Sequence, residues 1–124
     1  MVFVAFDDQP DRVRARLARR ESVDRDDDLV YVNLDTFNDE RRGYEFGTNA
    51  LGVQFDSLFI EGNDPDRTFD TLWYSKGQRT DRGFVVWFAL PFESLRFSDT
   101  TETRGVSNWR SRSGNARGSR RRTI

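Results

Sequence analysis

Apolar and polar residues alternate along most of the first hundred positions with the two-residue period of a β-strand. In the segment LVYVNLD, residues 29–35, Val30, Val32 and Leu34 share one side, which predicts a strand with one buried face. Similar alternation, or a short apolar run, predicts further strands at residues 2–6, 44–49, 53–60, 71–75 and 84–90. Turns rich in glycine, proline and aspartate separate these strands.

Residues 12–20, RVRARLARR, allow two predictions. Val13, Ala15 and Leu17 alternate with arginines, which favours a half-buried strand. Val13 and Leu17 are also spaced i, i+4 after a cap-like segment at residues 8–10, so a helix stays open as the alternative. In either case the arginines form a basic face, which could pair with acids on neighbouring strands or bind an anionic polymer.

Short strands at regular intervals, with turns between them, are typical of an antiparallel all-β fold such as a sandwich or barrel. We therefore predict one β domain over residues 1–99. Residues 100–124 show no periodicity and are rich in Arg, Ser and Gly. This composition predicts a disordered tail.

The chain contains no cysteine and no histidine, which excludes disulfides and metal sites built from thiolates or imidazoles. A metal ion would be held by oxygen atoms, and calcium fits such ligands best. An acid-rich run before the strand at 29–35, with Asp35 at the end of that strand, suggests Asp26, Asp28 and Asp35 as calcium ligands. The alternative is a solvated loop. No apolar run approaches the ~20 residues of a membrane-spanning helix, and no signal peptide is recognisable.

Charge is distributed unevenly along the chain. Residues 1–103 carry 13 basic and 21 acidic side chains, whereas residues 104–124 carry seven arginines and no acid. Trp109 among Arg and Ser gives the end of the chain a composition similar to that of proteins that bind single-stranded nucleic acid. Composition alone does not establish phosphate contacts, so nucleic acid is not an expected partner.

Three segments resemble the family 9 carbohydrate-binding module in their residues, their order and their spacing. They are LDTFNDERRGYEF at 34–46, NALGVQ at 49–54 and ALPFESLRF at 89–97. The resemblance covers residues 2–97. Within this family, the chain more specifically resembles the version found at the N-terminus of bacterial outer-membrane-associated proteins that continue into a β-barrel.

This resemblance implies an antiparallel β-sandwich of the jelly-roll or immunoglobulin-like type. The implied function is non-catalytic binding of a polysaccharide or oligosaccharide, accessory to polysaccharide breakdown by glycoside hydrolases or to envelope function. Some members of the family carry structural calcium. The implied location is periplasmic, outer-membrane-associated or secreted, with an outer-membrane barrel as a partner in the full-length protein.

The chain departs from the family pattern at three places. The family begins with one or more strands before residues 2–6, so we expect a fragment that lacks its first strand or strands. Trp87 stands where the family typically carries a glutamate. After residue 97 the family continues with another strand, of which Gly105 and Val106 are the only trace.

Aromatic side chains are the expected sugar-binding residues, because the C–H faces of sugars stack on aromatic rings. The candidates are Trp87, Trp73, Tyr31 and Tyr44; Trp87 is the strongest, because Val85 and Ala89 share its side of the strand and the phenylalanines lie opposite. The alternative is that these rings fill the core of the sandwich. A ligand-free structural or docking domain is then the alternative function, and no catalytic set supports an enzyme.

Overall fold

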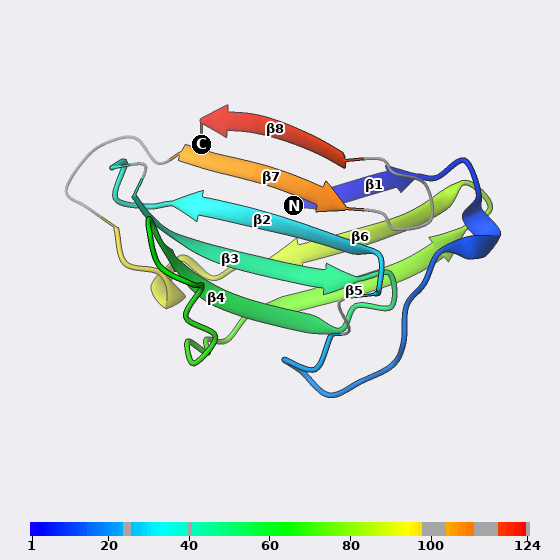
Figure 1. Ribbon diagram of the computed structural model, residues 1–124, viewed down its shortest axis with the longest axis horizontal. Helices are drawn as coiled ribbons and strands as arrows, with labels where there is room; N and C mark the ends of the chain where they lie inside the picture. The colour runs from blue at the N-terminus through cyan, green and yellow to red at the C-terminus, as the bar shows by residue number, and fades with distance from the viewer. Residues whose placement is uncertain (24–25, 40, 98–103, 111–116, 124) are drawn as a thin grey trace.

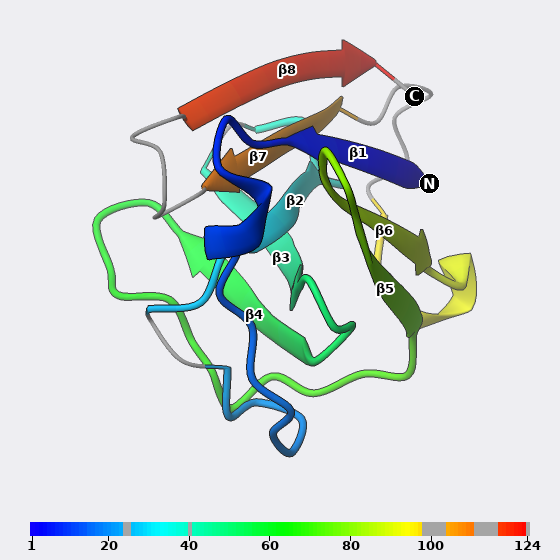
Figure 2. The ribbon, with the colours of Figure 1, turned by 90° about the vertical axis from the view of Figure 1, so that its right-hand side faces the viewer.

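The computed structural model describes residues 1–23, 26–39, 41–97, 104–110 and 117–123, the last two ranges by their backbone alone. Two antiparallel β-sheets and two short 3₁₀ helices make up the regular structure. The predicted all-β class is therefore confirmed. Figure 1 shows the larger sheet in front of the smaller one, and Figure 2 shows the two layers side by side.

The larger sheet has the strand order β4-β3-β2-β7-β8. Its strands are β2 (Leu29–Asp35), β3 (Arg42–Asn49), β4 (Gln54–Ile60), β7 (Arg104–Arg110) and β8 (Arg117–Thr123). Val30, Val32 and Leu34 are buried on its inner side, as the alternation predicts. The turn between β3 and β4 starts at Asn49, whose side-chain oxygen accepts hydrogen bonds from the backbone N–H groups of Leu51 and Val53.

The smaller sheet has the order β1-β6-β5, with β1 (Val2–Phe6), β6 (Gly83–Ala89) and β5 (Tyr74–Thr80). Phe84, Val86 and Phe88 of β6 point inward and are buried, while Val85 and Trp87 point outward. The prediction for β6 is thus confirmed. The strand predicted at residues 71–75 is wrong in its bounds. Only residues 74 and 75 belong to β5, and β5 continues through residues 76–80, which were predicted as a turn.

The core lies between the two sheets. Trp73 is at its centre: its ring stacks on Phe88 at 5.5 Å and meets the ring of Phe46 edge-on at 5.4 Å. Phe88 comes from the small sheet and Phe46 from the large one, so Trp73 links the two inner faces. Val13, Leu95 and the inward residues of β2, β3 and β6 complete this cluster.

Residues 13–19 do not form the predicted strand, nor the helix considered as its alternative. The backbone N–H groups of Arg14 and Arg16 donate to the carboxylates of Asp28 and Asp27, at 2.7 and 3.3 Å. Side chains therefore take the place of the carbonyl groups that a neighbouring strand would offer. Alternation alone could not reveal this, because it reports which side is buried and not what the backbone pairs with.

The backbone of residues 104–110 and 117–123 is also extended and paired, where the sequence pattern predicts a disordered tail. β7 pairs with β2 from Leu29 to Asp35, and β8 pairs with β7. The physical reason lies in β2, whose free edge would otherwise leave a row of backbone donors and acceptors without partners. Such pairing requires little from the side chains, so a sequence without periodicity can still supply it.

Within the described residues, no helix is long and apolar enough to cross a lipid bilayer.

Candidate functional site

The outer side of the small sheet carries an exposed aromatic pair, Trp87 on β6 and Tyr74 on β5. Trp87 is 43% exposed and Tyr74 is 53% exposed. Trp87 lies directly opposite Lys76, and Tyr74 lies opposite Ala89. Tyr74 and Trp87 are therefore diagonal neighbours on one face, with backbones about 7–8 Å apart. Both rings are open to solvent on the same side of the sheet, and we call the pair Trp87 and Tyr74 the aromatic platform.

We call the outward residues of this sheet the small-sheet face. They are Val2, Val4 and Phe6 of β1, Tyr74, Lys76 and Gln78 of β5, and Val85, Trp87 and Ala89 of β6. The β1 side chains are also exposed, at 62% for Val2, 55% for Val4 and 60% for Phe6. Large exposed apolar patches are uncommon on soluble proteins and often mediate interactions, so this face is the candidate site.

Among these outward residues Lys76 is the one charged residue, and it is also the single lysine of the chain. The guanidinium of Arg82, from the turn between β5 and β6, lies 5.0 Å from the centroid of the Phe6 ring and brings a second positive charge to this face. In the described part of the chain Lys76 forms no ion pair. None of the outward residues named above is acidic, although the chain has 21 acids. This face therefore combines aromatic and apolar contacts with positive charge.

Trp87 is thus exposed, as a sugar-stacking residue must be, but Trp73 is not. Trp73 is 2% exposed and packed between Phe46 and Phe88. Trp73 and Tyr74 are adjacent in the sequence and point to opposite sides. The outward residue is Tyr74, which was not predicted as a site residue. Alternation from Trp73 through Ser75, both inward, was the signal that could have identified it.

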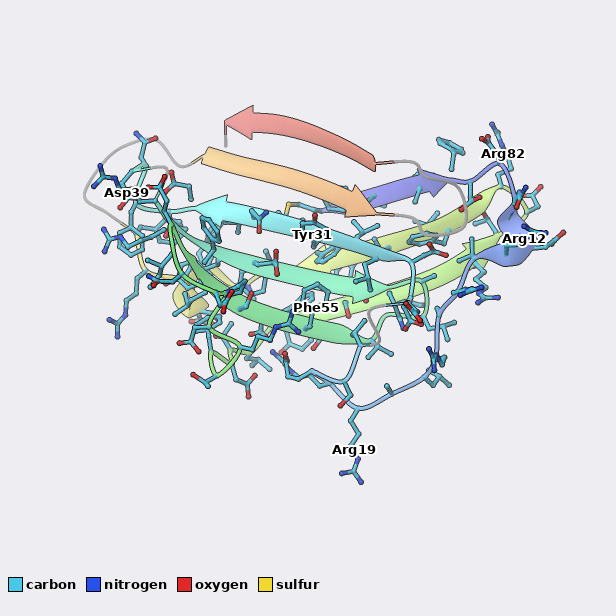
Figure 3. The ribbon with its side chains drawn as sticks, viewed as in Figure 1. Arg12, Arg19, Tyr31, Asp39, Phe55 and Arg82 are labelled. Carbon is cyan, nitrogen blue, oxygen red and sulfur yellow. The ribbon has the colours of Figure 1, made fainter. Side chains whose placement is uncertain are left out.

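The two tyrosines proposed as ligand residues do not join this platform. Tyr44 is buried in the core, and its hydroxyl accepts a hydrogen bond from the backbone N–H of Arg96. Tyr31 is half-buried on the outer side of the large sheet, in register with Gly47 and, beyond it, Phe55 (Figure 3). The ring of Phe55 covers Gly47, where an added Cβ would lie 2.1 Å from the ring. Tyr31 and Trp87 therefore serve different faces.

The structure does not assemble the calcium site expected from Asp26, Asp28 and Asp35. Asp28 precedes β2 and Asp35 ends it, so about 20 Å of extended chain separates their backbones. Asp28 is fully buried and holds the backbone of Arg14. Asp26 is half-buried in the loop before β2, and Asp35 accepts from the backbone N–H of Phe37. The acid-rich run is therefore largely an internal set of backbone acceptors.

A different cluster of acidic side chains comes together beside β4, the edge strand of the large sheet. Oxygen atoms of Glu21, Asp56 and Asp70 lie within 4.8 Å of one another, the one such group in the described residues. The guanidinium of Arg20 bridges them, with Nη2 2.7 Å from Asp56 and 3.0 Å from Asp70. Arg20 thus supplies the positive charge that a cation would bring. No sequence signal identifies this group, because its members come from three separate segments.

Burial raises the pKa of the Glu21 carboxyl to about 7, helped by its hydrogen bond with the Asp56 carboxyl. Burial also raises the pKa of Glu45, which lies on the outer side of β3 and accepts a hydrogen bond from the hydroxyl of Ser57. Neither carboxyl belongs to the small-sheet face. These groups therefore affect the stability of the large sheet and its loops, not the aromatic platform.

In comparisons with known proteins, no family model, no curated protein and no solved structure matches the chain.

Proposed function

We propose that this chain is a non-catalytic carbohydrate-binding module, and that its small-sheet face binds the polysaccharide. The observation that supports this function is the exposed pair Trp87 and Tyr74, held as diagonal neighbours on one flat sheet. Aromatic rings offer a large apolar surface with little conformational freedom to lose, which suits stacking on the C–H face of a sugar. Lys76 and Gln78 beside the rings supply hydrogen-bond donors.

We further propose that the two sheets form a β-sandwich of the jelly-roll or immunoglobulin-like type. The core shared between two antiparallel sheets supports this assignment. The resemblance of residues 2–97 to the family 9 module supports the same fold and function. On the same resemblance we place the protein in a bacterial periplasm or at the outer membrane, beside a barrel domain.

The test is binding of the purified chain to a panel of soluble glucans, xylans and acidic polysaccharides. Affinity electrophoresis and tryptophan fluorescence measure the binding. The parent protein is expected to be retarded by at least one polymer, with a saturable change in fluorescence. Trp87→Ala and Tyr74→Ala should each reduce the affinity by about tenfold or more, as loss of a stacked aromatic side chain does at other interfaces.

The matched control is Phe59→Ala, because Phe59 is 44% exposed, close to the 43% of Trp87, but lies on the large sheet. This variant should bind as the parent does. Equal binding by all three variants would contradict the assignment of the small-sheet face. Failure of every polymer to bind the folded parent would refute the function itself.

The exposed apolar residues of β1 favour one other function, a docking domain that binds protein. β1 is at the edge of its sheet, so its free backbone groups could pair with a strand of a partner. In that case Val4→Lys should abolish complex formation with the partner domain, and no polysaccharide should bind the folded parent. Polysaccharide binding that is lost in Trp87→Ala, with no complex formed with a partner domain, would favour the carbohydrate function.

A further inference from the structure

The position of Lys76 limits what the small-sheet face can bind. Lys76 is directly opposite Trp87 and two residues from Tyr74 on the same side of β5. Its backbone therefore lies about 7 Å from that of Tyr74 along the strand, so its long side chain is within reach of both rings. A ligand that stacks on the platform lies within reach of this charge.

The charge of Lys76 is not neutralised by the protein. In this it differs from Arg20, which bridges three carboxylates, and from Arg42, which pairs with Asp39 at 2.9 Å. Lys76 has no such partner in the described residues, and no outward residue of the small-sheet face is acidic. The free positive charge beside an aromatic platform is complementary to an anionic group on the ligand.

We infer that the ligand of this face is an acidic polysaccharide, in which a uronic-acid carboxylate accepts hydrogen bonds from the Lys76 ammonium group while its sugar ring stacks on Trp87 or Tyr74. This inference rests on the proposed carbohydrate-binding function and narrows its substrate class. A lysine suits the task, because its compact ammonium group has three donors on a flexible stem.

The low number of charges argues against the other anionic polymers. Nucleic acid is held by a stripe of cations that follows its closely spaced phosphates, and an anionic membrane surface is recognised by clusters of four to eight basic residues. The small-sheet face has two cations, Lys76 beside the rings and Arg82 beside Phe6, among apolar residues. One lysine beside two rings instead matches a polymer that carries one carboxylate on each sugar ring.

The test is calorimetric titration of the chain with uronic-acid oligosaccharides of two linkages, galacturonic and mannuronic, and with the same oligosaccharides after reduction of their carboxyl groups to alcohols. The acidic form of the preferred linkage should bind about tenfold more tightly than its reduced form, as expected for a charge-assisted hydrogen bond. Lys76→Gln should remove most of this preference, and Lys76→Arg should retain it.

Arg19→Gln is the matched control, because Arg19 is an exposed cation of the loop between β1 and β2, whose side chain projects away from both sheets (Figure 3). It should leave the preference unchanged. Equal binding of acidic and reduced forms would overturn the inference and leave the carbohydrate function intact. A preference that survives in Lys76→Gln would overturn the role of Lys76. Binding to single-stranded DNA in place of both sugar forms would overturn the inference and the proposed function together.

Discussion

Trp73 and Trp87 show how two side chains of one type acquire different roles from their environment. Trp73 is inward, stacked on Phe88 with the ring planes 4° apart, and almost without contact with solvent. Trp87 is one residue before Phe88 on β6 and points to the other side. The first contributes to stability and the second is available to a ligand.

This difference predicts unequal costs of truncation. Trp73→Ala should lower the free energy of unfolding by about 3–5 kcal/mol, because it opens a cavity between the two sheets. Trp87→Ala should cost no more than about 1.5 kcal/mol, because the ring is only partly withdrawn from water. Denaturant unfolding followed by circular dichroism measures both values, and similar costs would contradict the outward placement of Trp87.

At the scale of strands and turns, the pattern of apolar residues predicts β2, β3, β4 and β6 well. β2 and β6 alternate between buried and less buried residues, which is what periodicity records, whereas β3 and β4 bury residues on both sides. β5 was less visible, since its outward residues after Tyr74 are polar and Gly77 interrupts the pattern. β7 and β8 gave no signal, because their pairing with β2 and with each other is a property of the backbone.

The candidate site was predictable in part for the same reason. Trp87 lies within a clearly periodic strand, so its outward direction follows from its neighbours. Trp73 and Tyr74 lie at the start of β5, where a shift of one position exchanges inside for outside. The role of Asp27 and Asp28 depends on contacts with Arg14 and Arg16, more than ten residues earlier, and no local pattern reveals it.

The turn between β3 and β4 offers a test at this scale. Asn49 is fully buried; its side-chain amide donates to the carbonyl of Arg16 and to the Asp27 carboxylate, both at 2.9 Å. Asn49→Ala should lower the free energy of unfolding by about 3 kcal/mol, because it removes turn hydrogen bonds and a donor to a buried carboxylate.

Asn33→Ala is the matched control, because Asn33 is half-buried on the outer side of β2 and its side chain makes no comparable set of hydrogen bonds within the described residues. Its cost should stay within about 0.5 kcal/mol in the same unfolding experiment. Equal costs for the two substitutions would show that Asn49 does not hold the turn and the 13–19 segment together.

For the whole molecule, the group around Arg20 connects segments that are far apart in sequence. Arg20 reaches Asp56 on β4, Asp70 before β5 and the carbonyl of Thr71 at 2.6 Å. Asp56 is almost fully buried and also accepts from the backbone N–H of Thr71. The pKa of Glu21, raised to about 7, makes this connection dependent on pH.

The sign of that dependence follows from proton binding. Between pH about 4.5 and about 7, folded Glu21 retains a proton that the unfolded chain has released, so the Glu21 contribution to stability falls as pH rises through this window. Glu45, whose pKa is also raised, acts in the same direction. Asp39 and Asp66 have lowered pKa values, so their contribution is lost only at more acidic pH.

Glu21→Gln tests this assignment, because glutamine stays neutral and keeps a similar shape. The parent should lose more stability between pH 5 and pH 8 than the variant, as measured by chemical unfolding at each pH. Glu61→Gln is the control, since Glu61 is an exposed acid whose side chain is 68% accessible. Parallel pH profiles for parent and Glu21→Gln would contradict the raised pKa of Glu21.

The single lysine has a consequence for how this protein should be handled in the laboratory. Reagents that attach proteins to sensor surfaces or beads through amines react with the α-amino group and with lysine side chains, and Lys76 is the single lysine of the chain. Molecules coupled through Lys76 would be tethered by the small-sheet face, with Trp87 and Tyr74 against the support. A screen would record those molecules as inactive, whereas tethering through an engineered cysteine on the large sheet would leave the rings free.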